Sequence, residues 1–137
     1  MSQSVKTWII NANFIANFIA NFIRKHNMPN NTVFYGQIEP QQVDKIGAQG
    51  FKTIINNRPD GEEPNQPLQT DIATEAQQAG LAYHYLPVVG GQLTREQVEQ
   101  FAEIFNQAEK PVFMFCRSGN RSNVLFQSAK QLDLLDD

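Results

Sequence analysis

Cys116 is the only cysteine of this 137-residue chain, and it lies between two segments of very different character. The short apolar run 112–115 precedes it and is typical of a buried strand. A small polar loop follows, and then a segment with the pattern of a helix. Backbone N–H groups at such a strand–loop–helix junction bind anions and stabilise a thiolate. We therefore predict that Cys116 is a nucleophile whose pKa is lower than that of a free thiol.

The residues after Cys116 favour a reactive thiol over a structural one. A lone cysteine is more often a small buried hydrophobe. Here two arginines, a glycine and two serines follow within six residues, and such a segment would make a poor core. Gly119 lets the backbone approach an anion closely, and the guanidinium groups of Arg117 and Arg121 would stabilise a negative charge. We interpret the loop as an anion cradle around a thiolate.

Composition argues against several other kinds of function. The net charge of −3 and the pI near 5.3, with no basic stripe, argue against nucleic-acid binding. One cysteine permits no internal disulfide, so nothing indicates an oxidising compartment, and we expect a cytoplasmic protein. A single cysteine also excludes a zinc site built from several thiolates, and His26 and His84 show no ligand spacing. We therefore expect neither a metal nor a cofactor.

The elements that must position Cys116 alternate along the chain. Apolar runs predict strands, and turn and capping residues predict helices between them. The expected strands are 32–36, 51–55, 81–88 and 112–115, and the expected helices run from 40 to 47 or 50, over 68–78 and 94–107, and from 122 onward. This alternation predicts an α/β fold with a mostly parallel sheet of four to five strands flanked by helices.

Two polar segments follow predicted strands and should meet in space. Cys116 follows the strand 112–115, and the loop from Arg58 to Glu63 follows the strand 51–55. In open parallel sheets, ligands bind beyond the carboxyl ends of the strands. The loop from Arg58 to Glu63 is therefore either a plain surface loop or a wall of the pocket around Cys116.

The N-terminal segment contains a repeat. Asn-Phe-Ile-Ala occurs at 13–16 and 17–20, and nearly again at 21–24. Its period is close to that of a helix, which would place Phe14, Phe18 and Phe22 on one stripe. We expect residues 1–28 to form a helical extension and residues 29–137 to form the catalytic domain. The stripe would pack on the domain or a partner, including a second copy of the chain, lie on a membrane surface, or belong to a poorly ordered extension.

Five segments of the chain together carry the pattern of a known family: 36–38, 57–63, 80–83, 86–88 and 116–122. In them the chain resembles the bacterial phosphatase-like domain called DUF442, or beta-lactamase-hydrolase-like. The resemblance implies the fold of protein-tyrosine and dual-specificity phosphatases. It also implies that Cys116 is the nucleophile and Arg121 the clamp for the substrate anion. The N-terminal repeat lies outside it.

The sequence departs from the phosphatase pattern at two places. Tyrosine phosphatases place five residues between the cysteine and the arginine, whereas four lie between Cys116 and Arg121. Those phosphatases also carry a general-acid aspartate in the loop after the strand equivalent to 81–88, but the segment 89–93 contains no carboxylate. The shorter loop resembles the active loop of rhodanese sulfurtransferases instead.

Both departures favour sulfur transfer. A phosphatase must protonate a leaving alkoxide or phenoxide, whereas thiosulfate releases sulfite without help from an acid. A shorter loop also makes a smaller cradle, which suits one sulfur atom better than a phosphoryl group. We expect a sulfurtransferase that moves sulfane sulfur from thiosulfate or a persulfide as a persulfide on Cys116. The alternatives are a phosphatase that forms a phosphocysteine from a phosphate ester, arsenate or other redox chemistry, and a non-catalytic anion-binding domain.

The expected site residues take their roles from these chemistries. Ser122 would donate a hydrogen bond to the thiolate, and Arg121 would bind a sulfonate or phosphate through two hydrogen bonds. Arg117 either steers anions or is an ordinary surface arginine, and Asp60 is the candidate for a displaced general acid. The expected catalytic residues are Cys116, Arg121 and Asp60, and the expected anion-binding residues are Arg58, Arg117, Ser118, Gly119, Asn120 and Ser122.

Overall fold

The computed structural model describes residues 31–136, in which strands and helices alternate. The strands are β1 (Thr32–Tyr35), β2 (Thr53–Asn56), β3 (Ala82–Tyr85) and β4 (Val112–Phe115). The helices are the short 3₁₀ helix η2 (Pro40–Gln42), then α2 (Val43–Ala48), α3 (Gln69–Gln78), α4 (Arg95–Gln107) and α5 (Asn120–Gln131). The α/β alternation expected from the sequence is confirmed.

The four strands are parallel and pair in the order β1-β4-β2-β3. The central strands β4 and β2 are buried along their whole length, as expected for a parallel sheet covered on both faces. The pairing register places Phe115, the last residue of β4, beside both Tyr35 and Asn56, and Asn56 beside Tyr85. The carboxyl ends of all four strands therefore lie at one edge of the sheet, where the segments that follow them meet.

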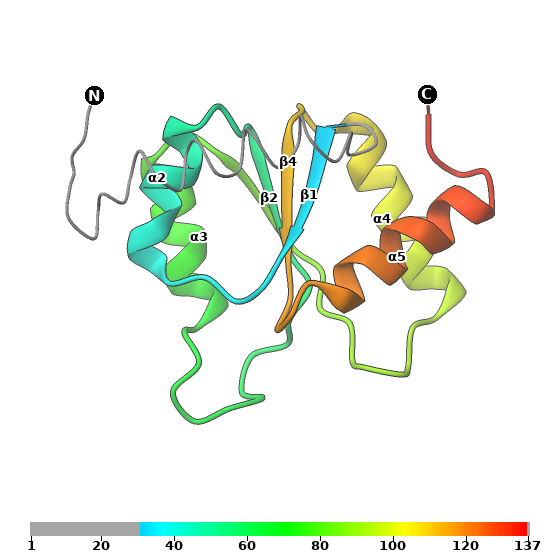
Figure 1. Ribbon diagram of the computed structural model, residues 1–137, viewed down its shortest axis with the longest axis horizontal. Helices are drawn as coiled ribbons and strands as arrows, with labels where there is room; N and C mark the ends of the chain where they lie inside the picture. The colour runs from blue at the N-terminus through cyan, green and yellow to red at the C-terminus, as the bar shows by residue number, and fades with distance from the viewer. Residues whose placement is uncertain (1–30, 137) are drawn as a thin grey trace.

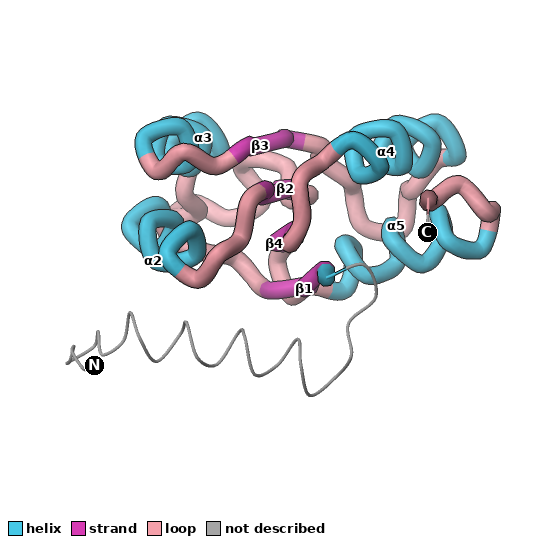
Figure 2. The backbone as a smooth tube through the Cα atoms, turned by 90° about the horizontal axis from the view of Figure 1, so that it is seen from above, coloured by secondary structure: helices cyan, strands magenta, loops and turns pink. Residues whose placement is uncertain are grey.

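The core has two halves, one on each face of the sheet. Successive residues of a strand point to opposite faces, so Ile54 packs with residues of α2 and α3, whereas Ile55 packs with residues of α4 and α5. Phe113 and Met114 divide in the same way. Figures 1 and 2 show the resulting three layers, with α2 and α3 on one side of the sheet and α4 and α5 on the other. The edge at which the four strands end is therefore part of a sheet that is packed on both faces.

Local signals place the ends of the helices close to the expected positions. Thr94 caps α4, and its hydroxyl accepts a hydrogen bond from the Gln97 amide in the expected capping box. Helix α5 begins at Asn120 rather than at the expected Ser122. Gly119 precedes it with a left-handed backbone (φ 97°), and the helical conformation starts directly after that residue.

Strand β3 covers only part of the expected strand 81–88. The amides of Leu86 and Val88 donate to the carbonyls of Asn56 and Asn57, at 2.9 Å each, beyond the regular pairing of the two strands. The chain therefore leaves the sheet after Tyr85 but stays attached to the segment that follows β2. This attachment brings Val88 to the edge at which β2 and β4 end.

The N-terminal segment 1–28, with Phe14, Phe18 and Phe22, lies outside the described residues. Its expected helix, its contacts with a partner or a membrane surface, and the domain boundary at residue 29 therefore stay predictions. Within residues 31–136, no helix combines the length and the apolar character needed to cross a bilayer.

Candidate active site

The Cys116 loop forms a cradle at the end of β4. The backbone amide of Cys116 bonds to the Tyr35 carbonyl at 3.3 Å, which holds the cysteine at the edge of the sheet. The chain then turns back, and the Gly119 amide lies 3.0 Å from Cys116 Sγ. Glycine is required at this turn because φ is 97° and a Cβ would lie 3.3 Å from the Tyr35 carbonyl oxygen.

The cradle lowers the pKa of Cys116 although the residue is fully buried. Burial opposes ionisation, but hydrogen bonds from the backbone and hydroxyl of Ser122 and from the backbone of Ser118 and Gly119 outweigh it. The Arg121 guanidinium also lies within hydrogen-bonding reach of the sulfur. A cysteine in this setting ionises at a lower pH than a free thiol, as a nucleophile requires.

Arg121, in the first turn of α5, has one edge of its guanidinium occupied. Nη1 and Nη2 donate to the Glu62 carboxylate at 2.7 and 2.9 Å, and Nη1 also donates to the Val88 carbonyl at 2.9 Å. These bonds use three of the five N–H donors of the side chain. Among the described residues, they leave the Nε–H and the second Nη2–H for Cys116 and for a bound anion.

Glu62 belongs to this site, and the sequence-based reasoning missed it. Its Oε1 also accepts a hydrogen bond from Arg58 Nε at 2.9 Å, so the carboxylate bridges two arginines. Hydrogen bonds from Arg121 and then from Arg58 outweigh burial and lower the pKa of Glu62 to about 2. The spacing of Arg58 and Glu62, four residues apart, is a local signal. The pairing of Glu62 with Arg121, 59 residues away, has no such signal.

Arg58 anchors the loop that carries Glu62. Its side chain is only 2% exposed and donates to Glu62, to Glu63 at 2.8 Å and to Gln37 Oε1 at 3.0 Å. A buried guanidinium with two carboxylate partners holds the loop against the segment that follows β1. The expected contact of Arg58 with a substrate anion stays a prediction.

The side chains of Arg117, Ser118 and Asn120 lie on the outer side of the cradle. The Arg117 side chain is 65% exposed, and its Nη2 lies 3.3 Å from Glu63 Oε2. Ser118 Oγ accepts a hydrogen bond from the Asn120 amide at 3.3 Å, and both residues are exposed. The loop thus directs backbone N–H groups toward the sulfur and polar side chains toward solvent.

Comparison with known proteins identifies the family to which the chain belongs. Residues 27–132 match the family described as beta-lactamase hydrolase-like protein, phosphatase-like domain. The chain belongs to this family. A beta-lactamase hydrolase-like protein of Agrobacterium fabrum is 43% identical over 98 residues, which are 72% of this chain and 23% of that protein. A protein of the same description from Xylella fastidiosa is 36% identical over 98 residues, with the same shares. The chain thus spans about a quarter of the length of these curated relatives.

Solved structures of phosphatase-like proteins share the fold. A phosphatase-family protein of Neisseria meningitidis has a TM-score of 0.62 and 38% identity, covering 66% of this chain and 65% of that one. A DUF442 protein of Shewanella putrefaciens has a TM-score of 0.64 and 24% identity, covering 80% and 69%. The core catalytic domain of a PP-IP phosphatase from S. cerevisiae has a TM-score of 0.59 at 14% identity, covering 78% and 64%, and shows the fold alone.

These findings confirm the DUF442 resemblance and the phosphatase-like fold expected from the sequence. They do not support the expected sulfurtransferase, and they agree better with the phosphatase alternative. The reason for the difference is that the four-residue spacing between Cys116 and Arg121, which pointed to rhodaneses, is carried here by a chain of a phosphatase-like family.

Asp60, the candidate for a displaced general acid, lies in the loop between β2 and α3, and its side chain contacts the first residue of α3. Its Oδ1 accepts a hydrogen bond from the Gln69 amide at 2.9 Å, and its own amide donates to the Tyr85 hydroxyl at 2.9 Å. Asp60 therefore caps α3, whose N-cap residue Leu68 makes no side-chain hydrogen bond. The hydrogen bonds of the described residues do not join its carboxylate to Cys116 or Arg121. Its catalytic role stays a prediction.

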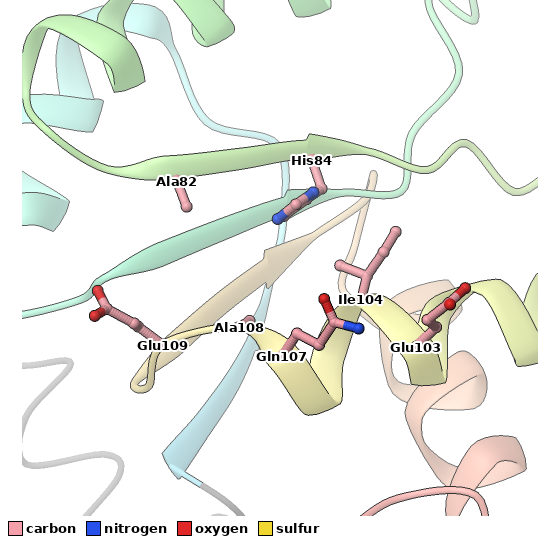
Figure 3. A pocket seen from close by; sticks show the side chains of 7 residues that line it. All are labelled: Ala82, His84, Glu103, Ile104, Gln107, Ala108 and Glu109. Carbon is pink, nitrogen blue, oxygen red and sulfur yellow. The ribbon is translucent and has the colours of Figure 1, made fainter.

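A separate pocket lies between β3 and the carboxyl end of α4 (Figure 3). It is lined by Ala82, His84, Glu103, Ile104, Gln107, Ala108 and Glu109, so none of the expected site residues contributes to it. His84 is partly buried there, and burial lowers its pKa. Within residues 31–136, no group of three or more histidine, cysteine, aspartate or glutamate side chains is placed to hold a metal ion.

Proposed function

We propose that the chain is a cysteine-dependent phosphatase that hydrolyses a phosphate monoester through a phosphocysteine on Cys116. The observation that carries the proposal is the cradle, in which the Gly119 amide lies 3.0 Å from a buried sulfur with a lowered pKa. Membership of a phosphatase-like family supports it. The substrate would be a small anion, because the open edge of Arg121 has two N–H donors, which Cys116 and the anion would share.

The proposed reaction has two steps. The Cys116 thiolate attacks phosphorus, the S–P bond forms, and the P–O bond to the leaving group breaks. The leaving oxygen takes a proton from water, or from Asp60 if substrate binding moves its loop toward the leaving group. Water then attacks phosphorus and gives up a proton to the conjugate base of that proton donor or to solvent, the S–P bond breaks, and Cys116 leaves as the thiolate. The amides of the cradle and Arg121 stabilise the phosphoryl oxygens in both steps.

Sulfur transfer is the second candidate, and a specific observation favours it. Arg121 and Arg58 keep Glu62 ionised, with a pKa of about 2, so the carboxylate next to Arg121 has no proton to give in the resting site. The segment 89–93 contains no carboxylate either. Transfer of sulfane sulfur from thiosulfate needs no such proton, and it would form a persulfide on Cys116 while sulfite leaves.

One pair of assays decides between the two chemistries. The chain is given para-nitrophenyl phosphate, or thiosulfate with cyanide, and kcat/KM is compared for each reaction. We expect phosphate release to dominate, and we expect a Cys116→Ser variant to lose it. Intact mass identifies the intermediate as a gain of one phosphoryl group or of one sulfur atom that dithiothreitol removes. Thiocyanate formation at the higher kcat/KM, with the sulfur adduct, would overturn the phosphatase proposal.

A further inference from the structure

Asn57 has a fixed orientation next to the candidate nucleophile. Its backbone amide donates to the Phe115 carbonyl at 2.8 Å, and its side-chain Nδ2 donates to the Leu86 carbonyl at 2.8 Å. A carbonyl oxygen only accepts hydrogen bonds, so the amide nitrogen must face Leu86 and Oδ1 must face the other way. On that side, Ser122 Oγ lies 2.8 Å from Oδ1.

The bond between Ser122 and Asn57 has only one direction. Oδ1 of an amide accepts and cannot donate, so the Ser122 hydroxyl must supply the proton. Asn57 and Ser122 are both 0% exposed, so bulk solvent does not reach either group. If the hydroxyl turned elsewhere, Oδ1 would become a buried acceptor without a donor, which is unfavourable.

Hydrogen bonding by the same hydroxyl is also one of the causes that lower the pKa of Cys116, whose sulfur is held 3.0 Å from the Gly119 amide in the same loop. A thiolate accepts and cannot donate, and a serine hydroxyl carries a single proton. While Cys116 is a thiol, its S–H can donate to Ser122 Oγ, and the hydroxyl can donate to Asn57. Once Cys116 is a thiolate, the hydroxyl has two acceptors and one proton.

We propose that Asn57 is a positioning residue that competes with the Cys116 sulfur for the single hydroxyl proton of Ser122. Asn57 thereby keeps the thiolate dependent on the backbone amides of the cradle and limits how far the hydroxyl stabilises it. A less stabilised thiolate is the stronger nucleophile. The proposal concerns the same sulfur as the proposed function, but it holds whether the group transferred is phosphoryl or sulfur.

Other groups near the sulfur stay constant in the test. Arg121 from α5 is the charged group in contact with Cys116, and Glu62 and Arg58 pair behind it. Arg117, next to Cys116 in the chain, pairs with Glu63. None of these side chains bonds to Asn57, whose own side chain bonds to Ser122 and to the Leu86 carbonyl, so the double variant tests whether its effect on Cys116 passes through Ser122.

The experiment measures the rate of Cys116 alkylation by iodoacetamide as a function of pH, which needs no turnover. It compares the wild-type chain with Asn57→Ala, Ser122→Ala and the double variant. We expect Asn57→Ala to shift the rate profile to lower pH, so that alkylation well below the pKa is about three- to tenfold faster. We expect Ser122→Ala to shift the profile to higher pH. In the double variant, the effect of Asn57→Ala should disappear.

Three outcomes would overturn the proposal: Asn57→Ala leaves the profile unchanged, shifts it to higher pH, or shifts it equally with and without the Ser122 hydroxyl. The last result would mean that the cavity admits solvent. Thermal unfolding of each variant checks the fold. If Asn57→Ala does not fold, Asn57→Leu is used under the same criteria, because its side chain fills a similar volume but carries no acceptor for the Ser122 hydroxyl. A failed phosphatase assay with the expected alkylation shifts would overturn the proposed function and leave this proposal standing.

Discussion

Two loops meet at the carboxyl edge of the sheet, and they are built in opposite ways. The cradle from Cys116 to Arg121 works mainly through its backbone, because amide groups point at the sulfur and the turn depends on the conformation of Gly119. The loop that begins at Arg58 works through side chains, because its two glutamates pair with three arginines. Substitutions in the cradle should therefore change the chemistry, whereas substitutions in the other loop should change orientation and stability.

The largest effect is expected at the centre of the cradle. Cys116→Ser keeps the size and shape of the side chain, but a hydroxyl does not ionise near neutral pH. We expect this variant to lose all measurable turnover and to keep the unfolding temperature of the wild-type chain within a few degrees. Steady-state kinetics and thermal unfolding measure the two quantities. Residual activity within a few-fold of the wild type would exclude Cys116 as the nucleophile.

The second-largest effect on activity is expected for Arg121, and it should distinguish this residue from Arg117, the other arginine of the cradle loop. Arg121→Lys keeps a positive charge but loses the fork of donors, so we expect kcat/KM to fall about 10²- to 10³-fold. Arg117→Lys is the matched control, because that side chain is 65% exposed and pairs with Glu63. We expect only a small change there. Equal losses in both variants would indicate that positive charge, and not the geometry of the fork, binds the anion.

The cradle could be predicted from the sequence, but the pairing partners of the loop that begins at Arg58 could be predicted only in part. An apolar run before Cys116 and a glycine in the turn after it are local patterns, and the parallel sheet follows from the alternation of elements. The partner of Arg121 is not local, because Glu62 lies 59 residues away. The role of Asn57 also depends on a contact across 65 residues, with Ser122. Such pairings depend on strand order, which the strand pattern alone does not give.

A third prediction tests the glutamate that joins the two loops. Glu62→Gln removes the carboxylate that holds one edge of Arg121, so we expect kcat to fall about tenfold. Inhibition by inorganic phosphate should become tighter at the same time, because the local positive charge is no longer balanced. Glu63→Gln is the control with the same change of charge, since Glu63 pairs with Arg58 and Arg117 but not with Arg121. An equal fall of kcat in both variants would contradict a positioning role of Glu62.

Glu62 should also make stability depend on pH in acid. Its pKa is lowered from 4.5 to about 2 in the folded state, chiefly by the hydrogen bonds from Arg121. A carboxyl group with a lowered pKa stabilises the fold fully above its unfolded value, and this contribution is lost as the pH falls through the folded value. The wild-type chain should therefore lose stability between about pH 4.5 and 2. Denaturant unfolding of Glu62→Gln should show a weaker dependence over this window, and equal slopes would contradict the pairing.

The smallest effect is expected for Asp60, and it tests whether the second loop takes part in chemistry at all. Asp60→Asn keeps an oxygen that can accept the Gln69 hydrogen bond but cannot supply a proton, whereas Asp60→Ala removes both functions. Because the Asp60 carboxylate bonds to the Gln69 amide, we expect Asp60→Asn to keep the activity and pH profile of the wild type. Asp60→Ala should lower the free energy of unfolding by about 1 kcal/mol, as for the loss of a helix cap. If the fall of phosphatase activity at high pH, where a general acid has lost its proton, disappears in Asp60→Asn, Asp60 is the proton donor, and the loop must move on substrate binding to bring its carboxyl group to the leaving oxygen. The division between a chemical cradle and a structural loop would then be wrong.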